Sequence, residues 1–375
     1  MLEDTDLDAA VAEGIVSPAQ AAALRELAAR RTRERAISQG HEERFRFMRG
    51  FNDVFFAVGV ALFVAGFAYL AGGNSGGLAL TTAVVWALSE LLIARLRLVL
   101  PGILLAILFV GLVFIALPVE RLLGIDVGQA QNAGPPAGLL DAMRSVPGVP
   151  LVIALRGVVA ALAAGAFYFR FKLPFALLPL AASLVAVVLA IASKLVPAAR
   201  IWDPLVLLVC GLAVFTAAMA FDASDRERAT RRADCAFWLH LLAAPLIVHS
   251  LIWLVSPALT ATSGAVRGGP SWQAMTPELA AAIVFIFSVL ALIAIAIDRR
   301  ALLVAGLTYL GAAIGYAISG GRAGPSVAFA VSMTLALLGA LVLVLGVGWM
   351  ALRRTLISRM SASLVNRLPP VPVRS

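Results

Sequence analysis

The chain has 375 residues, of which 61% are hydrophobic and only 14% are charged. Typical water-soluble domains are about 45 to 50% apolar and about 25% charged, so this composition excludes a soluble globular protein. The formal net charge of +9 is better explained by basic loops that hold helices in an anionic bilayer than by nucleic acid, which we do not expect as a partner.

Residues 1–51 are predicted to form a cytoplasmic helical hairpin and a linker. Gly14 ends a first short helix, Ser17 is a good N-cap for a second, Pro18 suits its first position, and Gln20 can complete a capping box. No apolar core of a cleavable signal occurs here, so the first hydrophobic segment is expected to be both signal and anchor. The hairpin is either a capped extension that leads into the membrane or a docking or oligomerisation module for a cytoplasmic protein partner.

The run Gly14-Ile15-Val16-Ser17-Pro18-Ala19-Gln20 resembles the N-terminus of a family of uncharacterised bacterial polytopic membrane proteins with a short Gly-Ile-x-Ser-x-x-Gln helical hairpin. Residues 349–356, with Arg353 and Arg354, are similar to the exit of such chains from their last span. The resemblance covers only the two ends of the chain. It implies a many-span membrane protein without an assigned activity, and it transfers no catalytic residue.

Residues 52–350 are predicted to form an all-α, polytopic transmembrane helix bundle. A helix that crosses a hydrocarbon core of about 30 Å needs about 20 mostly apolar residues, and ten segments qualify. Their apolar runs are continuous rather than alternating, which excludes membrane strands. The predicted spans are Val54–Ala71, Leu78–Ala94, Leu98–Pro118, Pro150–Phe169, Leu173–Ala192, Pro204–Phe221, Ala236–Val255, Leu279–Ile297, Ala301–Ser319 and Ser326–Met350.

Arginine and lysine determine the expected orientation, because they concentrate in cytoplasmic loops. With the N-terminus inside, 23 of the 30 Lys and Arg lie on the cytoplasmic side, six lie outside, and Arg156 lies within a span. One missed span would exchange the sides of every later loop, so this asymmetry favours an even number of spans. We predict a multi-pass protein of the bacterial inner membrane, with the lipid bilayer as its partner and both termini in the cytoplasm.

Two further pieces lie outside the predicted spans. The loop Val119–Gly148 is either a lid over an outward-facing cavity or a connector. Residues 351–375 form a cytoplasmic tail, in which Leu352–Arg367 mixes apolar residues with arginine and serine and predicts an amphipathic helix in the membrane interface. Trp349, just before this tail, is expected at the level of the lipid headgroups.

Four polar residues in the predicted spans are candidates for an intramembrane site: Glu90, Arg156, His240 and His249. Glu90 and His240 lie near the inner helix ends, whereas Arg156 and His249 lie deeper below the outer surface. They form either two polar layers or separate structural contacts: Glu90 and His240 can reach the headgroups, and His249 can bond a carbonyl that Pro245 leaves unpaired. Arg156 would favour a small anionic solute.

The loop before the seventh predicted span is the most highly charged part of the chain after the N-terminus. It is either a surface connector or a cytoplasmic gate or partner-binding element. The candidate residues in it are Asp225, Arg226, Arg228, Arg231 and Arg232.

Enzyme signatures are absent from the sequence. The chain has three histidines, and no carboxylate or cysteine cluster accompanies them, so we predict no metal site, no cofactor and no enzymatic activity. Glycines at helical spacing, including Gly157 and Gly165, indicate close helix packing. Two functions remain: binding or transport of a small solute, or a non-transporting sensor or assembly role through the hairpin and the arginine-rich loop.

Overall fold

The computed structural model describes residues 10–27, 51–125, 148–195, 202–225, 228, 230–259, 275–319, 327–361 and 368. Within these residues the chain forms helices and no strand. Beyond the N-terminal segment, the helices are α3 (Phe51–Ala71), α4 (Ser75–Ser89), η1 (Glu90–Arg95), α5 (Leu100–Ala116), α6 (Val119–Leu122), α9 (Val149–Phe171), η2 (Pro174–Ala176), α10 (Leu177–Leu195), α11 (Trp202–Ser224), α12 (Arg231–Leu259), α13 (Pro277–Ile297), α14 (Ala301–Ser319) and α15 (Val327–Ile357).

Ten helical segments in this part of the chain are long and apolar enough to cross a membrane. This confirms the all-α class and fits a multi-pass membrane protein. The ninth predicted span, Ala301–Ser319, has the bounds of α14. Other helices run past the predicted ends, since polar residues continue the helix beyond the apolar run: α12 begins at Arg231 rather than at Ala236, and α15 continues to Ile357 without a break at residue 350.

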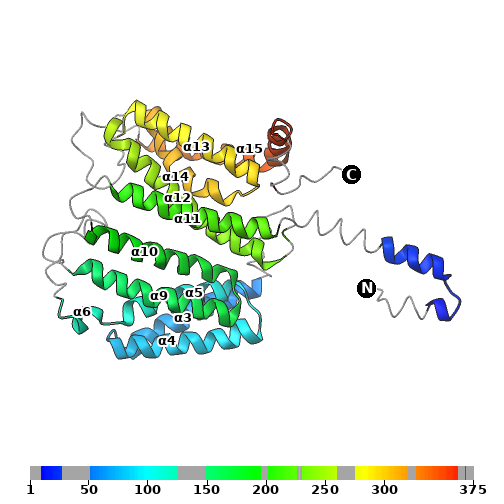
Figure 1. Ribbon diagram of the computed structural model, residues 1–375, viewed down its shortest axis with the longest axis horizontal. Coiled ribbons are helices and arrows are strands. Elements are labelled where there is room, and N and C mark those ends of the chain that lie inside the picture. Colours follow the sequence, from blue (N-terminus) through cyan, green and yellow to red (C-terminus); the bar gives the residue numbers. More distant parts are fainter. Residues whose placement is uncertain are drawn as a thin grey trace.

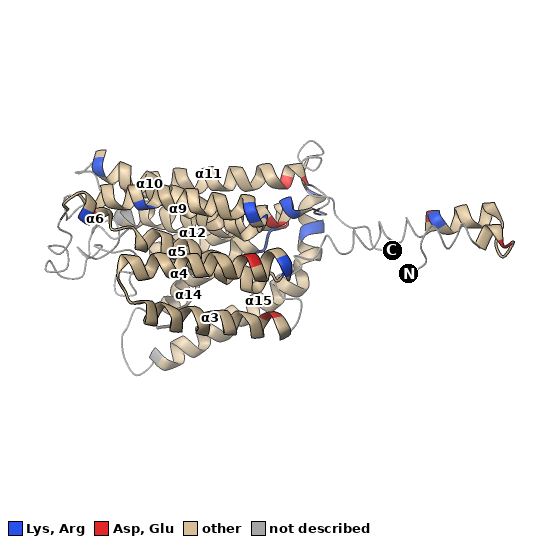
Figure 2. Cartoon of the chain, turned by 90° about the horizontal axis from the view of Figure 1, so that it is seen from below, with Lys and Arg blue, Asp and Glu red and all other residues tan. Residues whose placement is uncertain are grey.

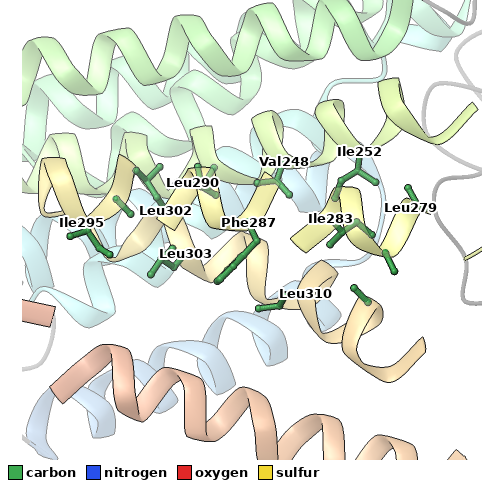
Figure 3. Close-up of a cluster of buried hydrophobic side chains, with 14 of the residues drawn as sticks. Val248, Ile252, Leu279, Ile283, Phe287, Leu290, Ile295, Leu302, Leu303 and Leu310 are labelled. Atoms are coloured by element: carbon green, nitrogen blue, oxygen red, sulfur yellow. The ribbon is translucent and has the colours of Figure 1, made fainter. Parts of the chain in front are cut away.

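The helices lie side by side, and their order across the bundle largely follows the sequence (Figure 1). A first group, α3, α4, α5 and α9, packs around buried side chains that include Val85, Leu105 and Phe167. A second group, α12, α13, α14 and α15, packs around a larger apolar cluster (Figure 3). Helices α10 and α11 lie between the groups and share a third cluster with α12.

Large apolar side chains cover much of the outer surface of the bundle. On α3, α13 and α15, Leu62, Phe285 and Leu343 are each about 70% exposed (71%, 69% and 70%). Water-soluble monomers rarely expose apolar surface on this scale, whereas hydrocarbon chains solvate it without cost. The outward apolar faces therefore match the composition of the chain.

Charged residues gather at the ends of the helices and leave the middle of the bundle uncharged (Figure 2). One end collects the turns after η1 and α9, the segment between α11 and α12, the turn between α13 and α14, and the end of α15. We call this the arginine-rich end. It is the end that the sequence predicts to be cytoplasmic, and its side of the membrane stays a prediction.

In the N-terminal segment, residues 10–12 and 18–27 are helical. Gly14 lies between them with a positive φ of 73°, which glycine adopts without strain. The Ser17 N–H donates to Gln20 Oε1 at 2.9 Å, and the Gln20 N–H donates to Ser17 Oγ at 3.2 Å, the reciprocal pattern of a capping box. The association of the two helices as a docking module stays a prediction.

Candidate functional site

Two features at the arginine-rich end have the chemistry of a site. The first is a buried network of charges centred on Asp222, in the last turn of α11. Its carboxylate accepts hydrogen bonds from Arg299 Nε at 3.1 Å and from Arg299 Nη2, and its Oδ2 lies 2.9 Å from His240 Nε2. The side chains of Asp222, His240 and Arg299 are 7%, 0% and 4% exposed. Side chains from α11, from α12 and from the turn after α13 therefore meet at one carboxylate.

Asp298 is the second carboxylate of this network. It follows α13 in the left-handed conformation, with φ at 57°, and so turns the chain into α14. Its Oδ1 accepts a hydrogen bond from Trp349 Nε1 at 2.7 Å, and its Oδ2 pairs with Arg228 Nη1 at 3.2 Å and with Arg353 Nη1 at 3.6 Å. The Arg300 guanidinium lies over the Trp349 ring in a cation–π contact, with Cζ 5.2 Å from the ring centroid.

We call the side chains around these two carboxylates the ionic cluster: Asp222, Arg228, His240, Asp298, Arg299, Trp349 and Arg353. Buried charges are tolerated only when they are paired and hydrogen-bonded, and here each aspartate meets more than one donor. The cluster joins α11, α12, the α13–α14 turn and α15. It therefore acts as a structural tie: its ion pairs hold the second group together and connect that group to α11. His240 Nδ1 is buried and accepts or donates no hydrogen bond among the described residues.

The second feature is an open cavity of about 770 Å³, which we call the cationic cavity. It lies where the η1–α5 turn and the α9–η2 turn of the first group meet the start of α12. Its lining is Ile93, Ala94, Arg97, Leu98, Val99, Ile103, Arg170, Phe171, Lys172, Leu173, Pro174, Phe175, Arg231, Asp234 and Trp238. Four of these residues are basic and one is acidic.

Local backbone geometry places two of the cations at this cavity. Arg97 and Lys172 both adopt the left-handed conformation, with φ of 55° and 54°, directly after a membrane helix. Residues other than glycine rarely adopt this conformation, so both turns are unusual for a long side chain. The π-helical segment η1, a form that is frequent at functional sites, precedes Arg97.

The positive charge of the cavity is only partly compensated. Arg170 pairs with Glu90, with Arg170 Nη2 and Glu90 Oε2 2.5 Å apart. Arg97, Lys172 and Arg231 form no ion pair with any carboxylate in the part of the chain that the structure describes. Lys172 instead lies over the Phe169 ring at 5.4 Å. Three cations without an ion-pair partner among the described residues therefore share one concave surface with a single carboxylate, Asp234.

The four predicted intramembrane residues have different partners. Glu90 holds Arg170 at the rim of the cationic cavity, and His240 belongs to the ionic cluster. Arg156 donates through Nη2 to Glu120 Oε2 at 2.7 Å and to the Leu117 carbonyl at 2.9 Å, a carbonyl that lies just before Pro118. His249 Nδ1 lies 2.5 Å from the Tyr309 hydroxyl oxygen. The hydrogen bonds thus pair neither Glu90 with His240 nor Arg156 with His249.

The predicted charged loop divides between the two features. Arg228 joins the ionic cluster, and Arg231 lines the cationic cavity. Asp225 Oδ2 accepts from the Thr230 N–H at 2.9 Å and from its hydroxyl at 2.6 Å, and the Arg232 N–H donates to Thr230 Oγ1 at 3.2 Å. Arg226 lies outside the described residues. Asp225 and Thr230 therefore hydrogen-bond within this segment and to the start of α12, whereas Arg228 pairs with Asp298 of the α13–α14 turn.

No group of three or more His, Cys, Asp or Glu that could hold a metal ion occurs among the residues the structure covers. Cys210 and Cys235 are both free and buried. Cys235 Sγ lies 3.9 Å from the Tyr168 hydroxyl oxygen, which joins α12 to α9 beside the cationic cavity.

Most residues of the ionic cluster lie outside the predicted spans, in predicted loops or in the predicted tail. Trp349, expected at the headgroups, is only 1% exposed and bonds Asp298. Arg353, placed in the tail, is fully buried. One sequence feature does indicate this cluster: the charged run Asp298-Arg299-Arg300 stands between two long apolar segments. An aspartate at a helix end can hydrogen-bond nearby groups.

Comparison with known proteins adds no relative: no family model, no curated protein and no solved structure matches the chain.

Proposed function

We propose that this chain is a multi-pass membrane protein that binds a small anionic solute in the cationic cavity and moves it between the cavity and the far side of the bundle. The observation that carries the proposal is the presence of Arg97, Lys172 and Arg231, without described carboxylate partners, around one cavity of about 770 Å³. Ligand sites in proteins are typically clefts of about 300 to 1,000 Å³, and a cleft lined by one sign of charge concentrates counter-ions.

The cationic cavity is a better candidate for the anion than the surroundings of Arg156. Arg156 is compensated by the Glu120 carboxylate and the Leu117 carbonyl, so an anion there would displace internal partners. Glu90, predicted near an inner helix end, contributes instead by pairing with Arg170 at the rim of the cavity. The anion-binding role of Arg156 stays an expectation that can be tested beside the cavity.

The position of the cavity supports movement as well as binding. One wall of the cavity comes from the first group of helices, and the other comes from α12. Ion pairs of the ionic cluster join α12 to the other helices of the second group. A shift of α12 against the first group would change the width of the cavity and would move Trp238 against the first-group cluster on which it packs. Rigid-body rocking of one bundle against another is a common basis of alternating access.

Ligand-dependent stabilisation tests the binding step. The purified protein is unfolded thermally in detergent with increasing phosphate, sulfate or small carboxylates, at constant ionic strength. An anion at 100 times its Kd stabilises the folded state by about 2.7 kcal/mol. We expect the double variant Arg97→Gln, Lys172→Gln to lose this stabilisation.

The matched control is Arg121→Gln, which removes an exposed arginine in α6, away from the cavity lining. We expect it to keep the anion response. The proposal fails if no anion stabilises the protein, or if the two variants respond alike.

A second candidate function is recruitment of a cytoplasmic protein through the N-terminal segment. The observation that favours it is the exposure of Ile15, Leu24 and Leu27, at 71%, 43% and 47%: Ile15 lies between the two short helices, and Leu24 and Leu27 lie on the second. Deletion of residues 2–36 distinguishes the candidates. A recruiting role is lost while the protein stays in the membrane, whereas anion binding in the cavity persists.

A further inference from the structure

The cationic cavity has two chemically different walls. Arg97, Arg170, Lys172 and Arg231 supply the charge, and these four residues are exposed. Asp234 is the one carboxylate of the lining, and the rest is mainly apolar: Ile93, Leu98, Ile103, Phe171, Phe175 and Trp238. A small hydrated anion gains nothing from an apolar wall, because the attraction of apolar surface requires an apolar group that leaves water.

The apolar wall is preformed. Phe175 and Trp238 pack edge to face with ring centroids 4.7 Å apart, which joins η2 to α12. The ring centroid of Phe171 lies 4.5 Å from that of Phe167 and 5.2 Å from that of Trp86, so Phe171 continues a cluster of tilted aromatic rings from the first group into the cavity. Aromatic pairs in these geometries hold their rings in place. The wall is therefore an established surface of the fold.

The depth of the cavity matches that of lipid headgroups. Its charged residues lie at the ends of helices of 21 and 23 residues: Arg97 follows the span Ser75–Arg95, and Arg170 and Lys172 close α9. Spans of this length place their ends at the boundary of the hydrocarbon core. Basic pockets between membrane helices at this level recognise phosphate-bearing headgroups, and guanidinium groups bind phosphate through paired hydrogen bonds.

We infer that the cavity takes an amphiphile with a phosphate-bearing head and a hydrocarbon tail. The phosphate lies among Arg97, Lys172 and Arg231, and the first methylenes of the tail lie against Phe171, Phe175 and Trp238. This inference rests on the proposed anion binding and names its substrate class. It explains why one cavity combines uncompensated cations with an aromatic wall.

The test compares four probes on the purified full chain in detergent: inorganic phosphate, glycerol phosphate, phosphatidylglycerol and phosphatidylcholine. Binding is read from the probe concentration that half-saturates the rise in unfolding temperature. Phosphatidylglycerol should act at a concentration at least about tenfold lower than glycerol phosphate, since burial of two methylenes suffices for that factor. Phosphatidylcholine has no net charge and so is attracted less strongly by the three cations. It should bind at least about tenfold more weakly than phosphatidylglycerol.

Variants separate the head from the tail. Ala94→Trp places a large ring at an exposed position of the cavity lining, so it should weaken phosphatidylglycerol and leave inorganic phosphate unchanged. Its control is Ala61→Trp, on the exposed face of α3. The double variant Arg97→Gln, Lys172→Gln should weaken both probes. All three variants keep the buried core residues and are expected to fold.

The outcomes distinguish this inference from the proposed function. One outcome is that inorganic phosphate and glycerol phosphate bind as tightly as phosphatidylglycerol and that Ala94→Trp leaves the binding of all three unchanged. The inference of an amphiphilic ligand is then wrong, and the proposed anion binding stands. If phosphatidylcholine equals phosphatidylglycerol, the cations take no part and the inference fails. If no probe raises the unfolding temperature, both proposals fail.

Discussion

Arg299 binds Asp222 side-on across 77 residues of sequence, with Nε and Nη2 each donating to a different carboxylate oxygen. The same Nη2 also donates to the Ala233 carbonyl at 3.2 Å. One guanidinium therefore joins the turn after α13 to the end of α11 and the start of α12. In a bundle whose other contacts are mainly apolar, this paired geometry specifies how the helix ends fit together.

Asp222→Ala should strongly destabilise the folded protein. It leaves Arg299 buried without its carboxylate, and loss of one partner of a buried ion pair costs about 3 to 5 kcal/mol. The measurement is thermal or denaturant unfolding in detergent. Glu90→Gln is the control, because it breaks an exposed pair with Arg170 that contributes about 0 to 1 kcal/mol. Equal effects of the two variants would show that the ionic cluster is not a structural tie.

Trp349→Phe should reduce stability through one hydrogen bond. The indole N–H is the donor to Asp298, and a hydrogen bond to a charged group contributes about 1.5 to 3 kcal/mol. A phenyl ring keeps a face for Arg300 but has no donor. Unfolding of Trp202→Phe provides the comparison, because Trp202 is 53% exposed. A loss no larger than that of Trp202→Phe would contradict the role given to Trp349.

Gly157→Ala should loosen the contact between α9 and α10. A Cβ at Gly157 would lie 2.7 Å from Val187 Cγ2 and 3.3 Å from the Ser183 carbonyl oxygen, and overpacking of this kind costs about 1 to 3 kcal/mol. At Gly165 on the same helix, the nearest atom would lie 3.6 Å away. Gly165→Ala should therefore be neutral or slightly stabilising, by up to about 1 kcal/mol. The reverse order of the two unfolding temperatures would refute this packing.

Arg156→Gln should change stability slightly and anion binding not at all. The pair with Glu120 is partly exposed, at 20% and 24%, so solvent screening limits its contribution to about 1 kcal/mol or less. Its function is to hold the short α6 turn against α9. Phosphate titration of this variant provides the measurement. A loss of anion response here, with the response of Arg97→Gln, Lys172→Gln intact, would move the anion site to Arg156.

The sequence was sufficient for the apolar architecture. Membrane helices are recognised from continuous apolar length, and Ala301–Ser319 needs no tertiary information to be located. Helix ends were less certain, because polar residues such as Arg231 and Arg232 extend α12 beyond its apolar run. Capping chemistry is local and readable, as for Ser17 with Gln20.

The two candidate sites could not be predicted, because each joins turns that are distant in sequence. The cationic cavity brings residues 93–103, 170–175 and 231–238 together, and nothing local in any of these stretches indicates the others. Asp298 and Arg353 resemble ordinary loop and tail charges until packing buries them against each other. Similar depth in the membrane predicts that Glu90 and His240 can share one polar layer. The packing of the helices instead pairs Glu90 with Arg170 and His240 with Asp222.

Cysteine labelling tests the central claim, that the chain spans a membrane with its arginine-rich end in the cytoplasm and with an odd number of spans between residues 73 and 358. Cys210 and Cys235 are replaced by alanine, and single cysteines are introduced as Gly73→Cys, where an added Cβ meets nothing within 4 Å, or as Ser358→Cys, at an exposed position after α15. A membrane-impermeant maleimide is added to intact spheroplasts of a bacterial host and, separately, to permeabilised ones. We expect the cysteine at position 73 to react in both and the cysteine at position 358 only after permeabilisation. Labelling of both positions from the same side would contradict the account.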